Sequence, residues 1–136
     1  MKKVIEGKDI PQAVGPYSAA IRVKDMLFTS GQLPINPETN ELVKGDIKLV
    51  AKQIFENIEN ILMKEGFSLD DVVKVTVFSA SMSYFNDFNE YYATLFKKPF
   101  PARSFFEVSK LPKDAQLEAE VIAIKSWSQV AQNKQN

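Results

Sequence analysis

The fold of this 136-residue chain is decided by residues 46–64, which read DIKLVAKQIFENIENILMK. Apolar residues recur there at spacings of three and four, which is the pattern of one face of an α-helix. Asp46 is a typical N-cap residue and Gly66 a typical stop signal. We therefore predict an amphipathic helix, and its predicted inner face consists of Ile47, Val50, Ala51, Ile54, Phe55, Ile58, Ile61 and Leu62.

The residues around this helix predict a sheet and a second helix. The sequence VVKVTVF at residues 72–78 is rich in β-branched residues and predicts a strand. Residues 83–96 predict a helix with an inner face of Phe85, Phe88, Tyr92, Leu95 and Phe96. Other strands are predicted at residues 4–5, 18–23, 26–30, 104–108 and 116–125, with a long loop at residues 31–45. The order β-β-β-α-β-α-β-β indicates an α+β fold with two helices packed on one face of a mixed sheet.

Apolar residues occupy both faces of the predicted central strands. They include Val72, Val73, Phe78, Ile122 and Ile124. Two helices can cover only one face, so the other face needs a partner, and a second subunit is the simplest one.

Composition excludes several classes of chemistry. The chain contains neither cysteine nor histidine, so disulfides, a cysteine nucleophile, a Ser–His–Asp triad and thiolate or imidazole metal ligands are excluded. Seventeen acidic residues balance 17 basic ones, which argues against non-specific nucleic-acid binding. The N-terminus lacks the apolar segment of a signal peptide, and no apolar run is long enough for a membrane helix. We predict one soluble, cytoplasmic domain at residues 1–126 and a polar tail at residues 127–136, whose start Trp127 could anchor.

Two charged residues stand out as candidate site residues. Only Arg22 and Arg103 among the basic residues are arginine, the side chain that grips carboxylates with a planar fork. Glu118 is an acid on a predicted strand that soon turns apolar. The residue types alone leave alternatives open, because Arg103 could form an ion pair with Glu107 or Glu120. Either Glu118 or Glu120, which share a strand face, could be a solvated acid.

Four sequence blocks in the same order resemble the Rid family (the YjgF-like proteins), and within it the RidA-type 2-iminobutanoate/2-iminopropanoate deaminases. The blocks are GPYS at residues 15–18, TSGQ at 29–32 with Pro34, KVTVF at 74–78, and PARS at 101–104 followed by Glu107-Val108, LPKD at 111–114 and EAE at 118–120. The resemblance covers residues 15–125.

The resemblance implies a chorismate-mutase-like homotrimer with pockets between subunits. It implies hydrolysis of enamines and imines, such as 2-aminoacrylate, to 2-keto acids and ammonia, with no cofactor and no metal. Arg103 would hold the substrate carboxylate, and Glu118 would position or activate water. Tyr17, Ser30, Gly31 and Asn89 match residues that line the pocket.

The chain departs from the family pattern at Phe105, where many members carry cysteine. Either the larger ring narrows or reshapes the pocket, or it turns away and only its backbone lines the site. Two other functions remain open: a non-catalytic binder of small carboxylates, and RNA-directed activity as a translation inhibitor or endoribonuclease. Zero net charge and the absence of histidine count against RNA.

Overall fold

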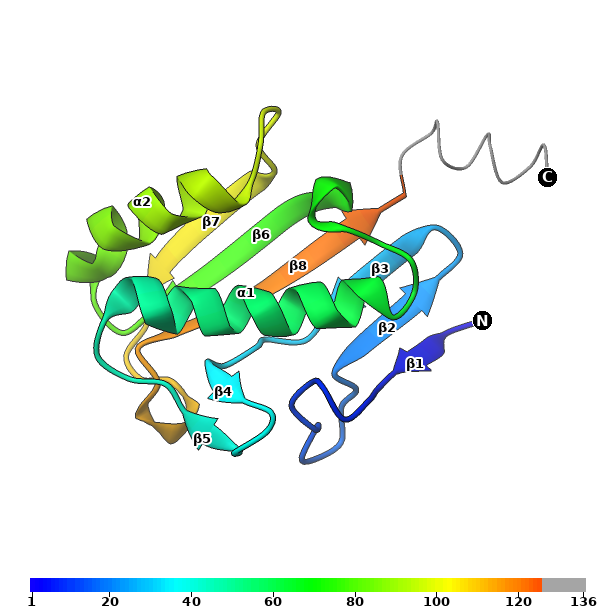
Figure 1. Ribbon diagram of the computed structural model, residues 1–136, viewed down its shortest axis with the longest axis horizontal. Coiled ribbons are helices and arrows are strands. Elements are labelled where there is room, and N and C mark those ends of the chain that lie inside the picture. Colours follow the sequence, from blue (N-terminus) through cyan, green and yellow to red (C-terminus); the bar gives the residue numbers. More distant parts are fainter. Residues whose placement is uncertain (126–136) are drawn as a thin grey trace.

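A computed structural model describes residues 1–125, and the predicted tail and Trp127 lie outside these residues. The main sheet has six strands. Figure 1 shows both helices on one face of it, as predicted. The strand order is β1-β2-β3-β8-β6-β7, and the β6–β7 pair is parallel while the other pairs are antiparallel. The strands of this sheet are β1 (Lys3–Ile5), β2 (Ala20–Val23), β3 (Met26–Thr29), β6 (Val72–Ser79), β7 (Ala102–Glu107) and β8 (Leu117–Ile124).

The helix α1 (Ile47–Met63) confirms the prediction from the opening stretch. The Asp46 carboxylate accepts hydrogen bonds from the backbone N–H groups of Lys48 (2.9 Å) and Leu49 (3.4 Å). The chain leaves the helix at Gly66, whose φ of 73° suits glycine. All eight predicted inner-face residues are buried against the sheet.

The helix α2 (Phe85–Leu95) starts two residues later than predicted. Residues Met82–Tyr84 form a 3₁₀ turn instead, and the Ser81 hydroxyl caps it by accepting from the Ser83 N–H at 3.1 Å. Phe88, Tyr92 and Phe96 are buried, and their rings pack around Phe55 of α1 at centroid distances of 6.3, 6.0 and 6.0 Å. The other two predicted inner-face residues, Phe85 and Leu95, are half-buried.

Two expectations about the connecting segments were wrong. Residues 31–45 are not only loop, because they contain the hairpin β4 (Ile35–Asn36) and β5 (Glu41–Leu42). The buried Asn57 amide of α1 ties β4 down by donating to the Ile35 carbonyl at 2.8 Å. The strand β7 starts at Ala102, so Arg103 lies inside the strand and pairs with Val75 of β6.

The face of the sheet opposite the helices, which we call the open face, carries exposed apolar side chains. On β8 the buried residues alternate with Glu118, Glu120, Ile122 and Ile124, which point to the open face. Val72 turns instead to the helix side, because the pairing register shifts between Val72 and Lys74. The exposed apolar residues of the open face are Val4, Met26, Phe28, Val73, Phe106 and Ile124. An apolar face of this kind fits the expected partner subunit.

No helix within residues 1–125 is long and apolar enough to cross a membrane.

The Asp46 cap gives a test of the fold. Replacing Asp46 by alanine leaves two N–H groups of α1 without their acceptor, so we expect the free energy of unfolding to fall by about 1 kcal/mol. Urea denaturation at a single protein concentration measures the change. Glu38→Ala, an exposed acid outside the helix, should change the value by no more than a few tenths of a kcal/mol. Equal effects of the two variants would contradict the capping role.

Candidate active site

Arg103 lies on the helix side of the sheet, beneath α2. Its partner in the parallel pair, Val75, is fully buried under the helices, which places the Arg103 side chain on the same side. The guanidinium carbon is 4.7 Å from the centroid of the Tyr92 ring, within range of a cation–π interaction. Three more rings lie within 6 Å of it: Phe88 at 5.6 Å, Phe85 at 5.8 Å and Phe105 at 5.9 Å.

The two arginines have contrasting surroundings. Arg22 donates to the carbonyls of Lys24 (2.9 Å) and Glu65 (3.2 Å), and its guanidinium lies 3.7 Å from the Glu65 carboxylate. Within residues 1–125, Arg103 has no carboxylate at ion-pair distance. The structural ion pairs considered from the sequence are therefore not formed. Glu107 instead accepts from the Met82 N–H at 2.8 Å, and Glu120 lies on the open face.

Arg103 thus has its guanidinium held between aromatic rings while its charge stays uncompensated by the described residues. Aromatic faces orient a cation without using up its hydrogen-bond donors. Such a group can take a carboxylate through two parallel N–H···O bonds.

Glu118 lies on the open face and touches Gly31. It pairs with Phe78 of β6, while its strand neighbours Leu117 and Ala119 are buried on the helix side. A Cβ atom added to Gly31 would overlap the Glu118 carboxylate, so only glycine allows this close approach. The backbone of the next residue, Gln32, bonds to the Ala119 carbonyl at 2.7 Å and holds the segment against β8.

Burial raises the pKa of the Glu118 carboxyl, and the negative charge of Glu120 raises it further. A carboxylate with a raised pKa is a stronger base once ionised, which suits proton transfer.

Tyr17 and Ser30 lie next to the Gly31 segment. The Ser30 hydroxyl donates to the Ser18 carbonyl at 2.6 Å, and the Ser30 N–H to the Ala19 carbonyl at 2.9 Å. These bonds join the segment of Tyr17 to that of Gly31. The Tyr17 side chain is 54% exposed.

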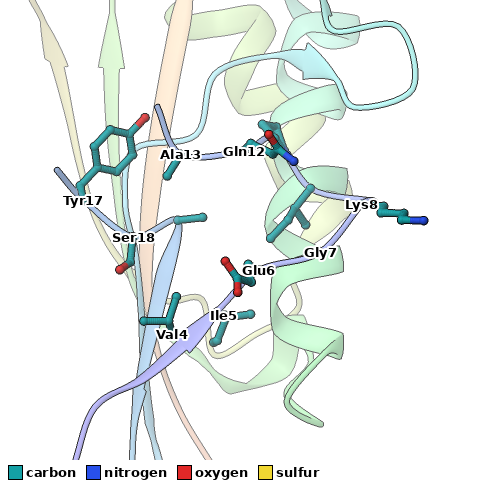
Figure 2. Close-up of a pocket in the computed structure, with 12 residues that line it drawn as sticks. Val4, Ile5, Glu6, Gly7, Lys8, Gln12, Ala13, Tyr17 and Ser18 are labelled. Carbon is teal, nitrogen blue, oxygen red and sulfur yellow. The ribbon is translucent and has the colours of Figure 1, made fainter. Parts of the chain in front are cut away.

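A hollow of about 560 Å³, not predicted from the sequence, opens beside Tyr17. Figure 2 shows Tyr17 and Ser18 on one side of it and the N-terminal segment with Glu6, Lys8 and Gln12 on the other. Pro11, Gly15 and Pro16 favour an irregular loop in this part of the chain. The hollow forms because that loop folds back beside β2, a tertiary feature with no local signal.

Asn89 and Phe105 belong with Arg103. Asn89 is half-buried and lies one helical turn after Phe85, so the two share a side of α2. The Phe105 ring packs edge-on against Phe85 (5.1 Å, 88°) and Phe88 (5.3 Å, 60°). Its side chain therefore faces the same side as Arg103, which favours a reshaped pocket over a site lined by the Phe105 backbone alone.

The predicted site residues form two groups on opposite faces of the sheet. The arginine group is Arg103, Phe105 and Asn89, and the glutamate group is Glu118, Gly31, Ser30 and Tyr17. One chain therefore does not bring Arg103 and Glu118 together. Among the described residues, no cluster of acidic side chains has the arrangement of a metal site.

The comparisons with known proteins agree on one family. The family model described as "Endoribonuclease L-PSP" matches residues 7–125. A RutC family protein of Pyrococcus horikoshii is 50% identical over 125 residues, covering 92% of this chain and 99% of the relative. A solved structure of a Yersinia pestis protein of the conserved Rid protein family is 46% identical to this chain, with a TM-score of 0.88. The match covers 92% of this chain and 100% of the Yersinia pestis chain.

A third relative carries both a functional name and a ligand. The Escherichia coli protein named "Putative reactive intermediate deaminase TdcF" is 40% identical to this chain. The match covers 93% of this chain and 99% of the TdcF chain. The crystal structure of TdcF with bound serine has a TM-score of 0.85 to this chain. The match covers 91% of this chain and 99% of the chain in that crystal structure.

Proposed function

Because this chain belongs to the Rid family, we propose that it is a hydrolytic deaminase of reactive enamines and imines. The proposed substrates are 2-aminoacrylate with its tautomer 2-iminopropanoate, and 2-iminobutanoate. The observation that carries the proposal is Arg103, a half-buried guanidinium oriented by four aromatic rings, with no carboxylate partner among residues 1–125. The functional name of the TdcF relative supports the reaction class.

In this proposal Arg103 binds the substrate carboxylate and fixes the position of the imine carbon. The carbon of a C=N group beside a carboxylate is already electrophilic, so hydrolysis needs orientation and proton transfer more than a strong nucleophile. Orientation by a bidentate pair can contribute a large part of the rate enhancement.

Glu118 acts on water in the same proposal. Its carboxylate accepts a proton from water as the oxygen bonds to the imine carbon, and it passes this proton to the nitrogen to give a carbinolamine. The hydroxyl group then gives its proton to the carboxylate, the amino nitrogen takes up this second proton, and the C–N bond breaks as C=O forms and ammonia leaves. One imine and one water give one 2-keto acid and one ammonia. No metal or cofactor takes part in these steps.

The complete pocket is proposed to form between subunits of a homotrimer. The arginine group and the glutamate group lie on opposite faces of one sheet. Contact between two chains can place the arginine group of one beside the glutamate group of the next, and in a closed ring each contact then makes one site. The exposed apolar residues of the open face supply the surface for this contact.

Non-catalytic carboxylate binding is a second candidate, since the TdcF crystal structure holds serine. Stabilisation by serine or a 2-keto acid in a thermal melt, without turnover of imines, would favour it. RNA-directed activity is a third candidate, supported by the description of the family model. Strongly salt-dependent RNA binding would favour that function over deamination.

The deaminase proposal is tested with a pair of matched variants. A serine dehydratase supplies 2-aminoacrylate, and pyruvate release is measured with and without this protein. We expect the protein to accelerate release, and Arg103→Lys to lower kcat/KM about 10- to 100-fold, because lysine lacks the fork that binds a carboxylate bidentately.

Arg22→Lys makes the same chemical change at the only other arginine, and a folded variant should keep the activity. The proposal fails if the protein gives no acceleration, or if Arg103→Lys is as active as Arg22→Lys.

The role of Glu118 predicts a pH profile. We expect kcat/KM to fall as the pH is lowered through the pKa of Glu118, since the protonated acid cannot take a proton from water. In Glu120→Gln this fall should move to lower pH, because the neighbouring negative charge that raises the Glu118 pKa is gone. Glu41→Gln, on the distant hairpin, is the control. An unmoved profile in Glu120→Gln, or an unchanged profile in Glu118→Gln, would contradict the role.

A further inference from the structure

The Phe105 ring lies directly beside the guanidinium proposed to bind the substrate. Arg103 and Phe105 are two residues apart on β7 and so project from the same face of the strand. The Arg103 guanidinium carbon is 5.9 Å from the centroid of the Phe105 ring. A carboxylate bound to Arg103 would have this ring as a neighbour.

The ring is fixed in place by its packing. It meets Phe85 and Phe88 of α2 edge-on, at centroid distances of 5.1 and 5.3 Å, and Phe88 is fully buried. Turning Phe105 away would break both aromatic contacts and leave a void beside the core. It is therefore a rigid wall that a substrate cannot push aside cheaply.

We propose that Phe105 determines substrate specificity by limiting the size of the substrate side chain. This inference rests on the proposed deaminase function. The side chain of a 2-imino acid is attached to the imine carbon, which is bonded directly to the carboxylate carbon, so a carboxylate held by Arg103 brings the side chain within reach of the ring. Hydrogen, methyl and ethyl groups fit beside such a wall, whereas branched and aromatic side chains meet it.

The proposal is tested with a series of imines of increasing size. An amino-acid oxidase generates 2-imino acids from alanine, 2-aminobutyrate, leucine and phenylalanine, and release of each 2-keto acid is compared with spontaneous hydrolysis. Each poorly fitting methylene costs an enzyme about 10- to 200-fold in kcat/KM. We expect the wild type to favour the alanine-derived imine over the leucine-derived imine by at least about 10-fold.

Phe105→Ala and Phe105→Val remove most of the ring, and valine suits a strand. Either variant should raise the ratio of kcat/KM for the leucine-derived to the alanine-derived imine at least about 10-fold. Phe100→Ala is the matched control, because Phe100 is an exposed phenylalanine outside both groups. This variant should leave the ratio unchanged.

The failures of the two proposals are distinguishable. A wild type that accelerates no imine overturns the deaminase function and the inference with it. Activity on the alanine-derived imine, with an unchanged ratio in a folded Phe105 variant, overturns only the role of Phe105. Equal rates of the wild type on the alanine- and phenylalanine-derived imines also overturn that role, without reference to any variant.

Discussion

The alternation of side chains along β-strands is the constraint on which the account of this protein depends. Val75 and Phe78 of β6 point to opposite faces of the sheet. Their cross-strand partners, Arg103 and Glu118, therefore also lie on opposite faces. The sheet itself therefore separates the cation that can hold a carboxylate from the acid that can activate water. No side-chain rotation in one chain can reverse that separation, so in the proposed mechanism a second chain completes the site.

Each half of the proposed site has a charge whose surroundings do not neutralise it. Arg22 lies over one aromatic ring and also contacts a carboxylate and two carbonyls, whereas Arg103 is surrounded by four aromatic rings with no carboxylate at ion-pair distance among residues 1–125. Glu118 is half-buried beside another acid, and both effects raise its pKa. Uncompensated charges of this kind disfavour the folded state, and they are expected where a ligand or a reaction uses them. In the proposed trimer, the exposed apolar residues of the open face belong to the contact that brings the two charges together.

The sequence predicted those parts of the structure that have a local signal. The periodicity of residues 46–64 predicted α1 and its buried face, and β-branched residues predicted β6. The hairpin β4–β5 was missed because its strands have two residues each and are held by the distant Asn57. The separation of Arg103 from Glu118 could not be predicted, because it depends on the register of β7 and β8 against β6. The contact of Gly31 with Glu118 likewise depends on strand placement.

The most direct test of a site shared between subunits is complementation of two inactive variants. Arg103→Ala and Glu118→Gln chains, each inactive alone, are co-expressed in equal amounts with different tags, and trimers carrying both tags are isolated. If each site takes Arg103 from one chain and Glu118 from the next, random assembly leaves about one quarter of all sites intact. About half of the sites receive an intact Arg103, and about half of those also receive an intact Glu118. Imine hydrolysis should then return to about a quarter of the wild-type rate in the unsorted mixture and should be found in the doubly tagged trimers. Activity no greater than the sum of the two variants would contradict a shared site.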